Sequence, residues 1–271
     1  MDKKLAVITV NFNNYSLTED FLSYFDKQTN SNFKIFISDL STKKKVIKNR
    51  PSIEVIIDEN KGYAHGVNLG LKTAQSQGFN YFIIINNDTR VDRDFIQKCQ
   101  ISYEKFPHSL TGGKIYYEKG FEYHKKYHVY QLGKIIWYAG GIIDWDNVFT
   151  KHRGVDEVDH GQFNKMEKTD FITGCLMLFD KQVLQTVGYW DEKYFLYYED
   201  ADYCMKATKK GVGLIYNPSI TIWHKNAQST GGAGSKIHQR YQERNRLRFG
   251  LKYAPLKTKL HLLKNYFFNQ L

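Results

Sequence analysis

Three acidic residues in one short segment could carry out proton transfer. The segment YYEDADYC places Glu199, Asp200 and Asp202 within four positions, directly after aromatic residues in YWDEKYFLYY. Carboxylates beside such rings suggest a sugar-binding wall with a general base at its rim. The structural alternative is that acids in the first turn of a helix interact favourably with the helix dipole. Both interpretations stay open for this segment alone.

Two further residues are suited to binding a metal ion. Asp88 follows an apolar run in IINNDTRV, and His224 ends the strand-like run ITIWH. A carboxylate and an imidazole can ligate one divalent cation if the fold brings them together. Alternatively, Asp88 or Thr89 caps a helix expected from about Asp92, and a single histidine is more often structural.

The elements that would position these residues alternate between strands and helices in the first half of the chain. This alternation predicts an α/β fold, with a mostly parallel sheet flanked by helices. Ligands bind such sheets at the carboxyl ends of the strands, so polar residues there should converge on one edge. Strands are expected at 5–12, 33–40, 53–58 and 82–85, and helices at 16–28, at 64–78 and from about 92. The polar residues at the strand ends include Thr9, Asn11, Ser38, Asp39, Asp58, Asn60, Asn86, Asn87 and Asp88.

The second half is less regular at first. Residues 112–170 are rich in Gly, Tyr, His and Trp, and they are interpreted as strands and loops. A buried strand is expected in FITGCLMLF, then a short helix, then a helix beginning near Glu199. We expect one domain over 1–250, divided into halves at 1–110 and 111–250. Residues 251–271 are expected to form a basic amphipathic helix that extends this domain.

The composition is that of a globular protein. The chain has 271 residues, of which 42% are apolar and 25% charged. No apolar run approaches the roughly 20 residues of a membrane span, and the N-terminal segment lacks a signal-peptide pattern. Three cysteines without metal-ligand spacing fit a reducing compartment, so we expect a cytoplasmic protein.

Positive charge is concentrated at one end of the chain. The net charge is +11, and residues 206–271 contain thirteen Lys and Arg but one acid, Glu243. This asymmetry favours a basic surface for phosphates, anionic lipid or nucleic acid, and the alternative is a solvated charged tail. Within it, STGGAGS precedes a basic run that includes Arg244, but neither the P-loop pattern nor GxGxxG is present.

The last segment is typical of an amphipathic helix. Leu256, Leu260, Leu263, Phe267 and Leu271 follow helical spacing, with lysines interspersed. Such a helix can lie on the inner face of the cell membrane and be attracted to anionic lipid. The alternative is that it docks on its own domain or on a second subunit of a homodimer.

Taken together, these segments resemble the family 2 glycosyltransferases of the GT-A fold, particularly bacterial rhamnosyl- and galactofuranosyltransferase-like members. The resemblance covers roughly residues 5–250, and NKGYAHGVNLG, NNDT and YYEDADYC are its most specific part. It implies a nucleotide-binding half at 1–110 and an acceptor and catalytic half at 111–250. The matching segments, in the family's order, are VITVNFNN, ISDLS, DENKGYAHGVNLGL, IINNDTRV, TGCLMLF, VGYWDEKYFLYYEDADYCMKA and IWHK.

The resemblance implies an inverting transfer of a sugar from a UDP- or dTDP-linked donor to a hydroxyl of a glycan or lipid-linked glycan in surface polysaccharide synthesis. Asp200 matches the family's catalytic base, and Asp88 and His224 match its ligands for Mn²⁺ or Mg²⁺. Asn86 stands where the Asp-X-Asp metal motif has its first acid, which removes one charge from the site. Implied donor-binding residues are Thr9, Asn11, Asp39, Asn60, Gly62, Asn86, Asn87 and Arg244, and implied acceptor-binding residues are Trp190, Tyr198 and Glu199.

Other functional classes fit the sequence less well. A nucleic-acid-binding protein would explain the basic C-terminal third, but the aromatic residues cluster with acids and no nucleic-acid motif is present. An inactive glycan-binding module would not need Asp88, Asp200 and His224. A sugar nucleotidyltransferase would need a glycine-rich N-terminal phosphate loop, which the sequence lacks.

Overall fold

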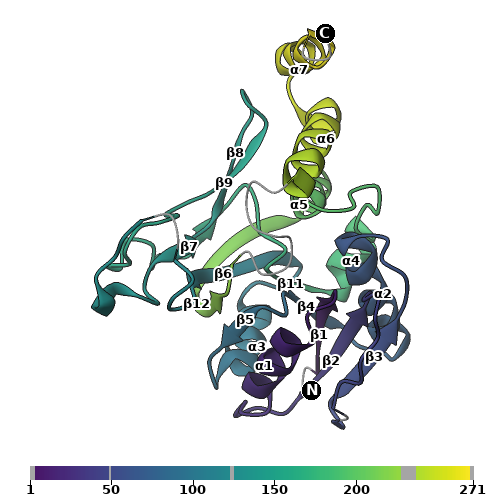
Figure 1. Cartoon of the computed structure of the whole chain (residues 1–271), viewed down its shortest axis with the longest axis vertical. Helices are drawn as coiled ribbons and strands as arrows, with labels where there is room; N and C mark the ends of the chain where they lie inside the picture. The colour runs from purple at the N-terminus through teal and green to yellow at the C-terminus, as the bar shows by residue number, and fades with distance from the viewer. Residues whose placement is uncertain (1–3, 49, 123–124, 227–235, 269–271) are drawn as a thin grey trace.

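The computed structural model describes residues 4–48, 50–122, 125–226 and 236–268 (Figure 1). Its main element is a mixed sheet with the strand order β10-β12-β6-β11-β4-β1-β2-β3, and within the described residues β5 and β7 pair at its side. Of the eight strands that form this path in the described part of the chain, six point the same way, and β10 and β11 run antiparallel to them. The predicted α/β fold class, with a mostly parallel sheet flanked by helices, is confirmed.

The first half supplies the parallel part of the sheet. Its strands are β1 (Leu5–Asn11), β2 (Phe33–Asp39), β3 (Ile53–Ile57) and β4 (Tyr81–Ile85), and its helices are α1 (Tyr15–Phe25), α2 (Tyr63–Ser76) and α3 (Phe95–Lys105). Leu5, Ala6, Val7 and Ile8 of β1 are fully buried. Such an unbroken apolar run is typical of a parallel strand that is covered on both faces.

The second half adds strands of more variable length, from 2 residues in β10 to 12 in β12. They are β5 (Thr89–Val91), β6 (Ser109–Tyr117), β7 (Ile136–Tyr138), β10 (Glu167–Lys168), β11 (Leu176–Asp180) and β12 (Gly213–His224). A separate hairpin is formed by β8 (Gly141–Asp144) and β9 (Phe149–His152), and a 3-10 turn, η1, spans Val129–Gln131. The helices are α4 (Lys181–Val187), α5 (Glu199–Lys209), α6 (Lys236–Tyr253) and α7 (Leu256–Phe268).

Helix α2 packs closely on β1 because two glycines face the strand. A Cβ atom on Gly66 would lie 2.8 Å from the Val10 side chain, and one on Gly70 would lie 2.6 Å from Ile8. Both distances are too short for real Cβ contacts, so only glycine permits this approach. The close packing fixes the start of α2 near the carboxyl end of β1.

Two local expectations were wrong. Thr89 does not cap a helix but begins β5, which pairs antiparallel with β12, and the helix begins later, at Phe95. The strand expected from Phe171 begins at Leu176, because Gly174 and Cys175 lie in a turn. The first difference places a short strand after Asp88, and the second places a turn at Gly174 and Cys175.

The C-terminal helices extend away from the sheet at the top of Figure 1, beside the β8–β9 hairpin. Trp145 between these strands stacks on Phe249 of α6, with ring centroids 5.7 Å apart. The helix predicted over 251–271 is the end of α6 followed by α7, with Pro255 between them. Among the described helices, none has both the length and the apolar character needed to cross a bilayer.

Helix α7 attaches to the domain by a face other than the predicted one. Leu262 is buried against Gly250 of α6. Leu256 is 73% exposed and Leu260 is 61% exposed, so the predicted apolar face is directed to solvent there. Of the other predicted positions, Leu263 is half-buried. The side chain of Phe267 and all of Leu271 lie outside the described residues.

Candidate active site

Polar side chains from the ends of three strands meet in a buried network. Asn11 at the end of β1 donates from Nδ2 to Asp39 Oδ1 at the end of β2, over 3.0 Å. Tyr15 donates its hydroxyl to Asp39 Oδ2 at 2.8 Å. Asn87, after β4, donates to Thr18 Oγ1 at 2.8 Å and to Asn11 Oδ1 at 3.3 Å. The structure thus brings together three of the predicted donor-binding residues.

The remaining donor-side residues lie apart from this network. Thr9 is buried on β1, and its hydroxyl has no hydrogen-bond partner. Asn60 is exposed and accepts a 3.0 Å bond from the Gly62 backbone N–H, at the start of α2. Gly62 has φ +107° and lies so close to Phe195 that a Cβ atom would collide with its backbone. Arg244 is exposed on α6.

Asp88 and His224 come together across the sheet. They follow β4 and end β12, and the pairing of β5 with β12 sets His224 opposite Thr89. The distance from His224 Nε2 to Asp88 Oδ1 is 3.2 Å, and both side chains are 6% exposed. Neither Asp88 Oδ1 nor His224 Nδ1 has a hydrogen-bond partner.

This pair fits two neighbouring ligands of an octahedral cation. Ligands about 2.1 Å from such an ion at right angles to each other are about 3.0 Å apart, close to the observed 3.2 Å. A carboxylate oxygen without a partner has a free lone pair for this purpose. The described residues contain no group of three or more His, Cys, Asp or Glu able to hold a metal. Asp88 and His224 would therefore supply two of the ligands of such an ion.

The turn that leads into α5 is held in a strained conformation. Tyr197 and Tyr198 both have φ +68°, which is unfavourable for residues other than glycine. The buried Asn245 of α6 donates to the backbone carbonyls of Leu196 and Tyr197 at 2.8 and 3.1 Å. Strain that is maintained by surrounding structure is frequent at functional sites. Sequence reasoning missed Asn245, since nothing in the basic run of α6 distinguishes it.

The strained turn presents two carboxylates with different surroundings. Asp200 accepts bonds from the backbone N–H groups of Gly174 at 2.8 Å and Ala201 at 2.7 Å. Burial raises the pKa of Asp200, and these two hydrogen bonds oppose the shift. Burial and the charge of Asp200 raise the pKa of Glu199 well above its usual range. Glu199 Oε2 has no hydrogen-bond partner, and the residue is 7% exposed.

Asp202, the third acid of this segment, is fully buried and holds two helices together. It accepts a 2.6 Å bond from Lys252 and a 3.0 Å bond from the Tyr253 hydroxyl, so it ties α5 to α6. These contacts give it a structural role. Asp200 and Glu199 remain as candidates for proton transfer.

Tyr63, which sequence reasoning missed, lies between the two candidate centres. Its hydroxyl is 2.9 Å from Asn86 Oδ1 and 3.0 Å from the Gly174 carbonyl oxygen. Cys175 is buried near the same residues: burial raises the pKa of its thiol well above the usual range, and the charges of Asp88 and Asp200 raise it further. The sequence feature that could have identified Tyr63 as a site residue is its position directly after the Asn60–Gly62 turn.

The predicted acceptor wall is buried. Trp190 is 2% exposed and Tyr198 is 4% exposed. The Trp190 ring stacks on Tyr203 and meets Tyr63 edge-on, at centroid distances of 5.3 and 6.1 Å. Tyr198 donates to the Val148 carbonyl at 2.8 Å. In this structure both residues are therefore enclosed by packing contacts within the protein. Glu199 is equally enclosed.

Another aromatic ring lies beside His224, at the edge where Asp88 and His224 meet. Trp137 of β7 is half-buried, and its ring meets His224 edge-on at a centroid distance of 4.6 Å. On another side it contacts His152 at 4.3 Å. Burial lowers the pKa of His152 to about 4, so that ring is neutral at physiological pH. The irregular 112–170 region, in which the sequence analysis named no site residue, thus contributes to this edge.

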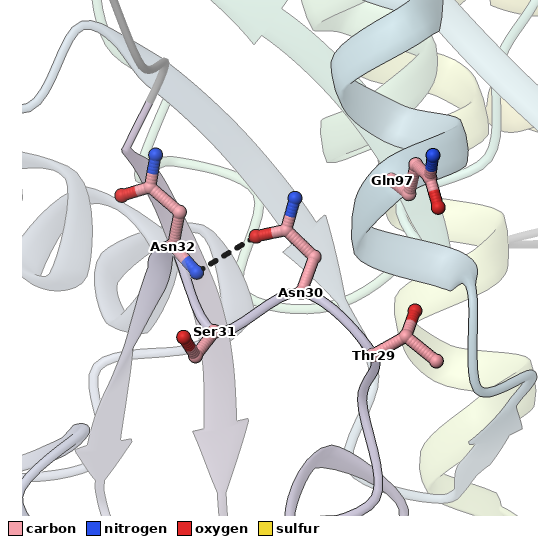
Figure 2. Close-up of a pocket in the computed structure, with 5 residues that line it drawn as sticks. All are labelled: Thr29, Asn30, Ser31, Asn32 and Gln97. Carbon is pink, nitrogen blue, oxygen red and sulfur yellow. Dashed lines mark hydrogen bonds between the residues drawn. The ribbon is translucent and has the colours of Figure 1, made fainter.

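A hollow elsewhere on the surface is unrelated to these residues. It has a volume of about 480 Å³ and is lined by the polar side chains of Thr29, Asn30, Ser31, Asn32 and Gln97 (Figure 2). In its floor, the Asn32 backbone N–H donates to Asn30 Oδ1 at 2.9 Å. Residues 29–32 directly precede β2 and Gln97 lies on α3, whereas the candidate site follows the strands. The hollow is therefore at the opposite edge of the sheet.

Comparison with solved structures supports the same fold. A structure of GalNAc-T7 with UDP, GalNAc and Mn²⁺ superposes with a TM-score of 0.71, at 16% identity, over 96% of this chain and 49% of that one. The Pyrobaculum calidifontis mannosyltransferase PcManGT, solved with GDP-Man and Mn²⁺, gives a TM-score of 0.52 at 16% identity, over 97% of this chain and 69% of that one. At these identities the similarity establishes the GT-A-like fold.

Sequence comparison identifies the family. Shigella flexneri dTDP-rhamnosyl transferase RfbF is 22% identical over 63% of this chain and 51% of its own length. The Haloferax volcanii low-salt glycan biosynthesis hexosyltransferase Agl10 is 18% identical over 57% and 46%. The chain thus spans about half the length of these curated relatives. The family model "Glycosyl transferase family group 2" matches residues 81–267, more than half of the chain. The chain therefore belongs to the family 2 glycosyltransferases.

Proposed function

We propose that this protein transfers a sugar from a nucleotide-diphosphate donor to a hydroxyl group of a glycan or lipid-linked glycan, with inversion, in surface polysaccharide synthesis. The observation that carries this proposal is the arrangement of two groups of residues around Tyr63. Asp88 and His224 pair near Asn86, which contacts the Tyr63 hydroxyl, and Asp200 is bound to Gly174, which the same hydroxyl also contacts. Two relatives are named as a dTDP-rhamnosyl transferase and a hexosyltransferase, and these names support a UDP- or dTDP-linked sugar as the donor.

The donor diphosphate would lie at the edge where Asp88 and His224 meet. These two residues would hold Mn²⁺ or Mg²⁺, and their 3.2 Å separation fits neighbouring ligand positions. When bound, the ion would neutralise charge on the leaving diphosphate. Asn11, Asp39 and Asn87 form the adjoining polar network and would contact the nucleoside.

Asp200 would act as the general base. It would take the proton of the acceptor hydroxyl, whose oxygen attacks the anomeric carbon as the bond to the diphosphate breaks. Products are the glycoside, the nucleoside diphosphate and protonated Asp200, which returns its proton to water. Asp200 is the better candidate because two backbone N–H groups stabilise its charged form, whereas burial and the charge of Asp200 disfavour the charged form of Glu199.

This assignment is favoured over two of the other functional classes considered, nucleic-acid binding and an inactive glycan-binding module. Family membership accounts for Asp88, Asp200 and His224, which nucleic-acid binding leaves without a role. A glycan-binding module would not need the unpartnered Asp88 oxygen beside His224.

We propose a cytoplasmic protein that rests on the inner face of the membrane through α7. Leu256 and Leu260 are exposed there, and lysines at 257, 259 and 264 alternate with them. An apolar face with interspersed positive charge is attracted to anionic lipid. The competing arrangement is a homodimer through the same leucines.

Donor binding and turnover test the proposed function directly. A thermal-shift screen with UDP, dTDP and GDP in the presence of Mn²⁺ should show one nucleotide that raises the melting temperature most. The matching sugar nucleotide should then release nucleoside diphosphate when an acceptor is added. If no nucleotide stabilises the protein and no sugar nucleotide turns over, the proposal fails.

Asp200→Asn should lower kcat by roughly 10²- to 10⁴-fold, because a general base is lost. Donor binding should change little, since Asp200 contacts backbone groups rather than the nucleotide network. The measurement is nucleoside diphosphate release at saturating donor. Asp146→Asn, an exposed change outside the site, is the control. Normal turnover by Asp200→Asn would instead direct attention to Glu199.

Glu199→Gln should flatten the dependence of stability on pH. The pKa of Glu199 is raised in the folded state, so its protonated form stabilises the fold fully below its unfolded pKa. That stabilisation is lost as pH rises from the unfolded toward the folded pKa. The neutral variant lacks this effect, so its unfolding free energy in urea should fall less between pH 5 and pH 8. Exposed Glu243→Gln should keep the wild-type slope.

Asp88→Ala should weaken the binding of Mn²⁺ together with the nucleoside diphosphate by roughly 10- to 100-fold or more, because one of two protein ligands is lost. Titration calorimetry measures this, and EDTA should abolish turnover. Asp92→Ala removes a nearby carboxylate that pairs with Lys98 and serves as the control. Full activity after exhaustive chelation would contradict metal dependence.

Leu256→Ser/Leu260→Ser in the full chain should reduce flotation with anionic liposomes, because the exposed apolar face of α7 is lost. Added salt should reduce flotation of the wild type by screening the lysines. Ile57→Ser is the control, since Ile57 is 64% exposed on β3, distant from α7. Wild-type protein that stays with the soluble fraction, and elutes as a dimer that the double variant disrupts, would favour the homodimer.

A further inference from the structure

The Tyr63 hydroxyl has two acceptors but only one proton. It lies 2.9 Å from Asn86 Oδ1 and 3.0 Å from the Gly174 carbonyl oxygen. A hydroxyl can donate one hydrogen bond at a time, although its oxygen can also accept. Both contacts are satisfied together if the Asn86 side chain presents its NH₂ group, since rotating an amide by 180° exchanges its oxygen and nitrogen. Asn86 then donates to Tyr63, and Tyr63 donates to Gly174.

Gly174 is the residue through which this bond reaches the base. Its backbone N–H donates to Asp200 Oδ2 at 2.8 Å. Its position is tightly enclosed, because a Cβ atom there would lie 3.2 Å from the Trp190 ring and 3.4 Å from Asp200 Cβ. The next residue is held as well, since the Cys175 carbonyl accepts from the Asn86 backbone N–H at 3.2 Å. A small movement of this turn therefore moves a hydrogen-bond donor of Asp200.

We infer that Tyr63 is a positioning residue for the transfer reaction, and that the amide of Asn86 is required for this role. The chain of hydrogen bonds that runs from Asn86 through Tyr63 and Gly174 to Asp200 fixes the position of the base relative to the segment that carries Asp88. This inference rests on the proposed function, in which Asp200 is the base.

The inference explains why an amide stands at position 86. A carboxylate there has no proton to donate to Tyr63, so it would compete with the Gly174 carbonyl for the single Tyr63 proton. A hydrogen bond to a charged acceptor is the stronger one, so the carboxylate would win. The Gly174 carbonyl would lose its partner, and the turn that supports Asp200 would loosen. An added charge near Asp88 would thus come at the expense of the base.

Tyr63→Phe is the first test, because it removes only the hydroxyl and keeps the ring against Trp190. It should lower kcat by roughly 10- to 100-fold, the cost of a misplaced catalytic group. The donor KM should stay within about two-fold, since Tyr63 is outside the nucleotide network. Asn86→Asp should lower kcat similarly, although it adds an acid to the metal motif.

Double variants separate positioning from a general loss of stability. Two changes that break one chain of hydrogen bonds are not additive. Tyr63→Phe/Asn86→Asp should therefore be no slower than the slower single variant. Tyr63→Phe should cost at most about two-fold further in an Asp200→Asn background. Tyr103→Phe is the matched control, because it removes a buried 2.7 Å bond to the Phe82 carbonyl and should leave kcat unchanged.

Hydrogen exchange gives a readout that does not require turnover. Tyr63→Phe and Asn86→Asp should each speed exchange of the Gly174 amide by roughly ten-fold or more, and Tyr103→Phe should not. Wild-type kcat and unchanged Gly174 exchange in Tyr63→Phe, or losses that multiply in the double variants, would overturn the inference. If the wild type transfers no sugar, the proposed function fails, and exchange at Gly174 still decides whether Tyr63 holds the turn.

Discussion

The antiparallel pairing of β11 with β4 is the constraint on which the candidate site depends. Leu176 lies opposite Ile85, so the residues just before β11 adjoin the residues just after β4. Only an antiparallel neighbour can place the start of one strand at the end of another. This register brings Gly174 and Cys175 beside Asn86, although they are far apart in sequence. A shift by one residue would also exchange the two faces of β11, which is buried throughout, so the register is strongly specified.

The second half of the sheet completes the site by a similar principle. The long strand β12 runs parallel to β6 and ends at His224, and short β5 pairs with that end. Thr89 thereby lies opposite His224, which leaves Asp88 within 3.2 Å of the imidazole. Asp88 and His224 thus stand at the ends of strands within one hydrogen-bonded framework, where their positions are better fixed than on long loops.

The sequence predicted those parts of the site that have a local signal. Asp88 and His224 follow strand-like runs, and the acids at 199–202 begin a helix, so their placement could be anticipated from neighbouring residues. The role of Thr89 could not, because β5 exists only through its pairing with β12. Tyr63 was missed because its partner Gly174 is 111 positions away. The burial of Trp190 was missed because residue type alone does not tell which face of a loop is covered.

The surroundings of Cys175 bear on the kind of reaction this site can support. A thiol is nucleophilic only as a thiolate, and burial together with the charges of Asp88 and Asp200 disfavours that form. Although it lies between the two candidate centres, Cys175 thus remains a neutral, unreactive group. An electrophilic carbon held nearby would not be captured by sulfur as a covalent adduct. The oxygen of an incoming acceptor would be left without competition from this side chain, as a single displacement requires.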